Sequence, residues 1–256
     1  MAEVTLSKKL AAEFLGTAAL VICGPGTAAA TFMIAKSTGV AFSMAQLGII
    51  SFAFMMVIIA LVYAIGHISG CHINPAVTLA LAAAKKQPWS EVPGYLVAQF
   101  AGGIAGAFAI WGILGKPGVD AGLGVLSYTP GNTGHAFFAE LIGTFLCILV
   151  VFGTATDSRA TPGWYGMAIP SIFFTVILVV APVTGAALNP ARYIGPMIAR
   201  ASLGGGKGLL WEQVPTYFIA TIAAGLLAAA VYAYLGSVKP VPAAQHASAE
   251  RISVPS

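Results

Sequence analysis

The chain has 256 residues, of which 58% are hydrophobic and only 8% are charged, and its mean hydropathy is +0.89. A soluble domain carries roughly a quarter charged residues, so this composition excludes a soluble domain and predicts an integral membrane protein. The formal net charge is +4, but the twelve Lys and Arg residues are spread thinly between apolar segments. They form no basic cluster of the kind that nucleic-acid binding requires, and nucleic acid is excluded as a partner.

Six apolar stretches are long enough to cross a bilayer, which needs about 20 residues of helix. These stretches are 10–35, 44–66, 92–114, 136–155, 164–183 and 213–235. The first follows two lysines and resembles a signal peptide, but it is too long for one, so we expect a retained spanning helix. The Gly- and Pro-rich stretch 115–134 is expected to be a loop. Residues 237–256, rich in Ala, Pro and Ser, are expected to form a disordered tail.

Three cysteines, Cys23, Cys71 and Cys147, lie inside apolar segments at unrelated spacings. Their number is odd and they form no CxxC pair, so the sequence suggests free thiols and neither a disulfide framework nor a metal site. We therefore expect no cofactor.

Two further apolar stretches, 67–84 and 184–200, are too short to span, and each contains the triplet Asn-Pro-Ala. The two triplets are Asn74, Pro75 and Ala76, and Asn189, Pro190 and Ala191. Asn is a preferred helix N-cap and Pro is tolerated in a helix's first turn, so each triplet predicts a helix start. About ten residues remain after each proline, which is half a membrane. One copy could be an ordinary turn, but two copies with matching flanks make that interpretation improbable.

The two halves of the chain also begin alike, since residues 12–17 match residues 139–144. Each half, about 8–114 and 134–236, contains three spans. Three is an odd number, so the second copy must cross the membrane upside down. Inverted repeats of this kind place their broken helices near the midplane, around a solute path. The predicted fold class is therefore all-α and integral to the membrane, with six spanning helices and two re-entrant half-helices.

Two inverted half-helices would meet with their N-termini at the membrane centre. Each N-terminus carries roughly half a positive charge, so the pair should repel cations and protons. The side-chain oxygens of Asn74 and Asn189 can cap the helices, which leaves both NH2 groups free to donate to a passing solute. Irregular backbone at membrane depth must be buried or line a wet cavity, so carbonyls of the preceding residues are expected to form a ladder of acceptors. They belong to Gly70, Cys71, His72, Gly185, Ala186 and Ala187.

Three charged residues lie in the interior of the apolar stretches, away from their ends. Glu13 and Glu140 occupy matching positions in the repeats, and we expect them to accept hydrogen bonds from the two irregular loops. The alternative is that they bind coupling ions or relay protons. Arg192 lies directly after the second triplet, at the wrong end of a helix dipole for stability, which favours a polar role at a constriction.

Two histidines and a glycine cluster remain to be assigned. His67 and His72 flank the first triplet; a satisfied buried role is the simpler interpretation, with pH gating by His67 as the functional alternative. Gly102, Gly103 and Gly106 lie at a spacing that permits close helix contact, either within the chain or between subunits.

The positive-inside rule predicts orientation from Lys and Arg near the ends of the spans. Seven of these residues lie on the side of the two termini, namely Lys8, Lys9, Lys85, Lys86, Arg159, Lys239 and Arg251. Four lie on the other side, namely Lys36, Lys116, Arg200 and Lys207. Both termini are therefore predicted to be cytoplasmic.

With the paired triplets, the matching acidic helix starts and Arg192 in place, the sequence resembles the aquaporin and aquaglyceroporin family from about Lys8 to Gly236. The resemblance implies a single channel domain over residues 1–236, in a right-handed bundle with one pore per subunit. It also implies a homotetramer in the plasma membrane. Residues 237–256 would then be a cytoplasmic tail.

The same resemblance places a selectivity filter at Phe54, Ile177, Ala186 and Arg192. Water-selective members usually have a histidine where this chain has Ile177, and glycerol channels usually combine Trp, Gly and Phe with the arginine. The filter matches neither pattern and looks closest to archaeal-type members. It should be less polar and somewhat wider than in a strict water channel. Cys71, in the place before Asn74 that Ala186 occupies before Asn189, is a candidate for mercurial block.

The leading hypothesis is a passive channel for water that also passes glycerol or another small uncharged solute and excludes protons and ions. One alternative is a glycerol-preferring facilitator. A second is an ion-coupled secondary transporter that uses Glu13 or Glu140. An enzyme is disfavoured, because no paired carboxylates, metal-ligand cluster or Ser/His/Asp set is visible in the spans.

Overall fold

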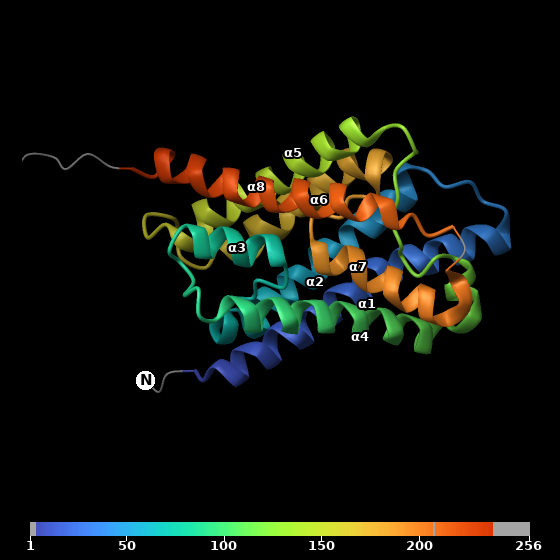
Figure 1. Ribbon diagram of the computed structural model, residues 1–256, viewed down its shortest axis with the longest axis horizontal. Helices are drawn as coiled ribbons and strands as arrows, with labels where there is room; N and C mark the ends of the chain where they lie inside the picture. Colours follow the sequence, from blue (N-terminus) through green and yellow to red (C-terminus); the bar gives the residue numbers. More distant parts are fainter. Residues whose placement is uncertain (1–3, 207, 238–256) are drawn as a thin grey trace, which may run out of the picture.

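A computed structural model describes residues 4–206 and 208–237 (Figure 1). Its main helices are α1 (Leu6–Thr38), α2 (Met44–Ser69), α3 (Pro75–Ala83), α4 (Val92–Asp120), α5 (Thr133–Val151), α6 (Tyr165–Thr184), α7 (Pro190–Arg200) and α8 (Val214–Leu235). Three short helical turns complete the list: η1 (Phe152–Thr156), η2 (Ala201–Gly205) and η3 (Trp211–Gln213). Six segments are long and apolar enough to cross a membrane, and they coincide with the six predicted spans. The all-helical membrane fold is thus confirmed.

The two half-helices begin at the predicted prolines, and α3 has 9 residues while α7 has 11. One expectation about the connections is wrong. The stretch 115–134 was predicted to be a loop throughout, but α4 continues through it to Asp120 after a break at Gly115, which has φ 60° and ψ −153°. Glycine adopts this backbone readily, and Pro117 then suits the first turn of a new helical segment. Of the predicted tail 237–256, only Ser237 lies within the described residues.

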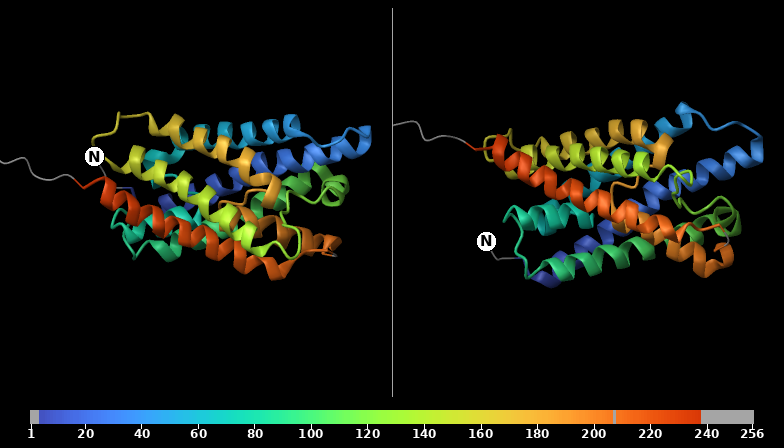
Figure 2. Two further views of the ribbon diagram at one scale, coloured as in Figure 1. Left: turned by 90° about the horizontal axis from the view of Figure 1, so that it is seen from above. Right: turned by 45° about the horizontal axis from the view of Figure 1, so that its top comes forward.

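The repeats have the same helix order and the same internal packing. In the first repeat α1 packs on α2 and α4, and in the second α5 packs on α6 and α8. The repeats meet where α2 packs on α6, and each half-helix packs on the other repeat, α3 on α8 and α7 on α4. Figures 1 and 2 show α3 and α7 extending from the middle of the bundle toward opposite ends. The half-helices are therefore locked between the repeats.

Small residues make this close packing possible. A Cβ added to Gly102 would lie 2.3 Å from the carbonyl oxygen of Phe14 in α1, and one added to Gly106 would lie 2.5 Å from that of Ala18. A Cβ added to Gly103 would lie 2.6 Å from the carbonyl oxygen of Ala191 in α7. Gly102, Gly103 and Gly106 therefore mediate contacts within the chain, one of the two possibilities, within the chain or between subunits, that the sequence left open.

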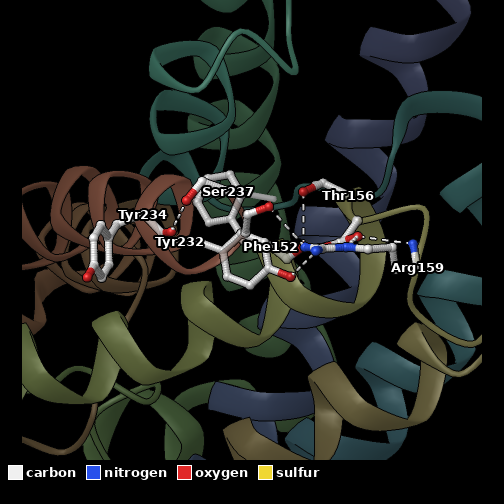
Figure 3. A network of polar contacts seen from close by, with 8 residues as sticks. Phe152, Thr156, Arg159, Tyr232, Tyr234 and Ser237 are labelled. Carbon is white, nitrogen blue, oxygen red and sulfur yellow. Dashed lines mark hydrogen bonds and ion pairs between the residues drawn. The ribbon is translucent and has the colours of Figure 1, made fainter. Parts of the chain in front are cut away.

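A polar cluster ties the α5–α6 connection to the end of α8 (Figure 3). Asp157 accepts hydrogen bonds from Arg159 Nε, at 2.8 Å, and from the Tyr232 hydroxyl, at 2.7 Å. Arg159 also donates to the carbonyl of Gly236 at 3.1 Å. These hydrogen bonds, from Arg159 first and then from Tyr232, hold the pKa of the Asp157 carboxyl well below its usual range. The cluster lies at the same end of the bundle as the N-terminus (Figure 2).

Candidate functional site

Two irregular loops lead into the half-helices at the centre of the bundle: the first loop, residues 69–74, and the second loop, residues 184–189. Each ends in an N-capping asparagine with an extended backbone. Asn74 Oδ1 accepts from the backbone N–H of Ala76 at 2.9 Å, and Asn189 Oδ1 accepts from those of Ala191 and Arg192 at 2.9 and 3.2 Å. The caps satisfy backbone donors that a helix start leaves unpaired.

The asparagine amides join the two loops to each other. Asn74 Nδ2 donates to the carbonyl of Leu188 at 2.9 Å, and Asn189 Nδ2 donates to the carbonyl of Ile73 at 2.8 Å. The expectation that both NH2 groups are wholly free for a solute is therefore wrong. An amide nitrogen has two hydrogens, and the close approach of the loops uses one hydrogen of each. One N–H of each asparagine amide has no partner among the described residues.

Two buried carboxylates hold the loops in position from behind. Glu13 accepts from Ser69 Oγ at 2.7 Å, from the N–H groups of His72 and Ile73 at 2.9 and 2.6 Å, and from Gln99 Nε2 at 2.8 Å. Both Glu13 and Glu140 are 0% exposed. Buried carboxylates are tolerated when strong donors satisfy them, and Glu13 has four.

Glu140 accepts three of the four corresponding hydrogen bonds in the second repeat. It accepts from Thr184 Oγ1 at 2.6 Å and from the N–H groups of Ala187 and Leu188, both at 2.8 Å. Two tyrosines missed by the sequence analysis complete the frame, since Tyr95 and Tyr217 donate to the carbonyls that begin the two loops, those of Ser69 and Thr184, both at 2.8 Å.

The backbone of both loops is left-handed at matching positions. Cys71 and Ile73 have φ 50° and 44°, and Ala186 and Leu188 have φ 57° and 53°. Such values are uncommon for residues with a side chain and persist only where the surroundings enforce them. Within the described part of the chain, no hydrogen bond reaches the carbonyls of the six residues singled out above, Gly70, Cys71, His72, Gly185, Ala186 and Ala187. Unpartnered carbonyls at this depth are acceptable where they contact water.

Arg192 is 2% exposed and lies at the start of α7. Its guanidinium carbon lies 5.4 Å from the centre of the Phe54 ring, and its Nη1 donates to the carbonyl of Gly124 at 3.1 Å. Nε has no partner among the described residues. The guanidinium therefore keeps donor capacity beyond its contact with Gly124, a partner that no sequence signal indicated.

Two cavities open from opposite ends of the bundle. The cavity beside Arg192, about 480 Å³, is lined by Phe54, Ile177, Gly185 and Arg192 among others, from both repeats. Ala186 lies with Phe54 and Ile177 in one buried cluster, so the structure brings all four predicted filter residues into the same region.

The first-repeat cavity, about 370 Å³, extends from the end that holds the N-terminus to Asn74 and Asn189. It is lined by His67, Cys71, His72 and many apolar side chains. His67 is exposed. His72 is buried, and its Nδ1 lies 3.1 Å from Thr78 Oγ1, so it belongs to the frame of the loop.

Comparisons with known proteins agree with this architecture. The family model described as "Major intrinsic protein" matches residues 1–232. The chain belongs to the major intrinsic protein family. The family includes Aquaporin AqpM of Methanothermobacter marburgensis, to which this chain is 39% identical over 247 residues, covering 91% of this chain and 99% of that protein. Aquaporin Z of Bradyrhizobium diazoefficiens is 35% identical over 240 residues, covering 89% and 93%.

Among solved structures, the aquaglyceroporin from Plasmodium falciparum matches with a TM-score of 0.74 and 21% identity, over 91% of this chain and 97% of that one. At this identity the likeness concerns the fold alone. Members of the major intrinsic protein family are membrane channels, and this chain is accordingly a passive channel for water or other small uncharged solutes.

Proposed function

We propose that the pore of this channel connects the two cavities past Asn74 and Asn189, and that it conducts water and also admits glycerol-sized neutral solutes. The observation that carries the proposal is the set of six carbonyls that have no hydrogen-bond partner among the described residues, beside two asparagines whose amides each keep one N–H. Such acceptors and donors can replace the hydrogen bonds of a neutral molecule as it leaves bulk water. Residues 8–114 and 134–236 would each supply half of this path.

We propose further that ions and protons are excluded by two positive features. The N-termini of α3 and α7 meet at the centre, where each contributes roughly half a positive charge. Arg192 adds a full charge at the filter of Phe54, Ile177 and Ala186. A cation on this path would have to lose water against an unfavourable potential.

Solute choice would depend on the filter. Ile177 offers no hydrogen bond and Ala186 is small, so the constriction supports passage of a molecule larger and less polar than water. The four donors on Glu13 and three on Glu140 support a structural role for both carboxylates, because no oxygen of either is left without a protein partner to hold a coupling ion. This favours the passive channel over an ion-coupled transporter.

Topology and assembly follow as proposals of the same kind. The start of α1, the α3–α4 and α5–α6 connections and the end of α8 lie at one end of the bundle (Figure 1). The first three of these segments carry Lys8, Lys9, Lys85, Lys86 and Arg159. This charge supports cytoplasmic termini in a plasma membrane. Exposed apolar side chains along the spans support contact with lipid and, in a homotetramer, with neighbouring subunits.

The decisive experiment is stopped-flow light scattering of proteoliposomes with a solute panel of water, glycerol and urea. We expect fast osmotic shrinkage with a low activation energy, and glycerol uptake above that of empty vesicles. Water flow no faster than in empty vesicles would contradict the channel proposal. Uphill uptake driven by a proton or sodium gradient would favour the transporter instead.

A further inference from the structure

The guanidinium of Arg192 depends on a segment far from it in sequence, the outer loop, residues 122–128. Gly124 in this loop supplies the carbonyl that Arg192 contacts, and Val125, Leu126 and Ser127 line the same cavity as Arg192. Gly124 has φ 76°, and a Cβ there would lie 2.6 Å from Pro25 of α1. The outer loop thus forms one wall of the filter, and its position decides where the guanidinium is held.

At the far end of the outer loop, one side chain holds both backbone polar groups of Tyr128. Gln213, at the end of η3 and just before α8, is 2% exposed. Its Oε1 accepts from the backbone N–H of Tyr128 at 2.9 Å, and its Nε2 donates to the carbonyl of the same residue at 2.7 Å. A primary amide is the side-chain group that can serve a backbone donor and acceptor at once. Gln213 therefore fixes both polar groups of Tyr128.

We propose that Gln213 is a positioning residue for solute selection: by clamping Tyr128 it fixes the outer loop, and through Gly124 it holds Arg192 at the filter. Gln213 lines neither cavity and has no hydrogen bond to Arg192 among the described residues. Its influence passes through the backbone between 124 and 128. This inference rests on the proposed pore. It adds Gln213, which lies outside the filter, to the residues that determine selectivity.

Without the clamp, the outer loop keeps its buried Leu123 and the Tyr128 hydroxyl, which lies 3.0 Å from Thr216 Oγ1. These contacts keep the loop attached, but without Gln213 the backbone N–H and carbonyl of Tyr128 are not fixed. The wall of the filter can then move away from Arg192. A wider and less polar constriction favours glycerol over water.

The test compares Gln213→Met, which removes both hydrogen bonds at similar volume, with wild type in proteoliposomes. The readout is the ratio of glycerol to water permeability, because a loss of folded channels lowers both permeabilities and leaves their ratio unchanged. We expect the ratio to rise about threefold or more, the order that one net hydrogen bond can supply. Gln213→Glu keeps the acceptor and loses the donor, and should shift the ratio in the same direction.

The matched control is Gln87→Met, the same change at a buried glutamine at the opposite end of the bundle, whose Nε2 contacts Glu91. Its ratio should equal that of wild type. In an Arg192→Ala background, Gln213→Met should have no further effect on the ratio, since the two act through one path.

The inference would be overturned if the ratio of glycerol to water permeability in Gln213→Met stays at the wild-type value or falls. If this variant does not assemble, the same ratio in Gln213→Glu decides by the same criterion. A wild-type protein without water flow would instead overturn the proposed function, so the two failures are distinguishable.

Discussion

The two loops at the centre of this channel share one frame and differ in what lies beyond it. In both, a buried glutamate holds two backbone N–H groups and a hydroxyl, and a tyrosine holds the first carbonyl. Behind the first loop, the Thr78 hydroxyl extends the hydrogen-bond network. Its Oγ1 contacts His72 Nδ1 and accepts from Gln99 Nε2 at 2.9 Å. Behind the second, the residue matching Thr78 is Tyr193, whose ring stacks on Tyr217 with centroids 4.0 Å apart.

The two repeats differ more in the residues that line the cavities than in the residues behind the loops. The first helices of the repeats are offset by 127 positions, but the half-helices and the helices before them are offset by 115, since Ser69 matches Thr184 and Asn74 matches Asn189. By this offset, the filter residues Phe54, Ile177, Ala186 and Arg192 correspond to four residues that line the first-repeat cavity, namely Ile169, Val62, Cys71 and Val77. The two repeats therefore share the parts that place the backbone. In the proposed filter, the one charged residue, Arg192, has Val77 as its counterpart, so we expect selection to be concentrated at the Arg192 end of the path.

The largest expected effect is on the shared frame. Glu13→Ala would leave four buried donors without their acceptor and Glu140→Ala would leave three, at about 1–3 kcal/mol for each unsatisfied group. Both variants should lose thermal stability in detergent, Glu13→Ala more than Glu140→Ala, as measured by tryptophan fluorescence and size exclusion. Equal melting temperatures, or the reverse order, would contradict the ranking by number of donors.

The next largest effect is expected from Arg192, whose charge has no counterpart at the matching position of the first repeat. Arg192→Ala should raise proton and ion leakage of proteoliposomes by about tenfold, because a full positive charge leaves the filter. Val77→Ala, at the matching position of the first repeat, is the control and should leave leakage at the wild-type level. Unaltered leakage in Arg192→Ala would mean that the N-termini of α3 and α7 suffice as the barrier.

A smaller effect is expected from filter polarity. Ile177→His should lower the ratio of glycerol to water permeability about threefold, because a larger polar ring narrows the constriction and favours water. Val62→His, at the matching position in the first-repeat cavity, should change this ratio less. The same shift in both variants would assign selection to the whole path rather than to the second half.

The smallest effect on permeability is expected from a substitution of Cys71, the residue that matches Ala186. Cys71 lines the first-repeat cavity, so a mercurial bound to its thiol should obstruct water flow. Cys71→Ser should keep water permeability close to wild type and lose the block. Cys23→Ser, which removes an exposed cysteine, should retain it. A block that persists in Cys71→Ser would place the reactive thiol elsewhere.

Much of this architecture could be predicted from local signals. The spans follow from apolar length, and the half-helices from Asn-Pro at a helix start, because both depend on residues close in sequence. The partners of the loops could not be predicted in the same way. Tyr95, Gln99 and Gln213 reach their positions only when distant helices pack, and nothing in their neighbouring residues distinguishes them from buried polar residues with no role.

Two expectations were wrong, for different reasons. The asparagine amides were expected to be free because the sequence shows each loop alone, whereas in the fold each amide meets the carbonyl of the other loop. The continuation of α4 past Gly115 was missed because Gly and Pro usually mark a loop. Here they mark a break between two helical segments.

The reciprocal bonds of Asn74 to Leu188 and Asn189 to Ile73 have the form of a contact across a two-fold axis, where each partner gives the other what it receives. Homodimers make such isologous contacts between separate chains. The centre of this channel is thus a dimer interface enclosed within one polypeptide. During synthesis, Asn74 and the Ile73 carbonyl can find these partners only after the second half has been made, so neither half can complete the proposed pore alone.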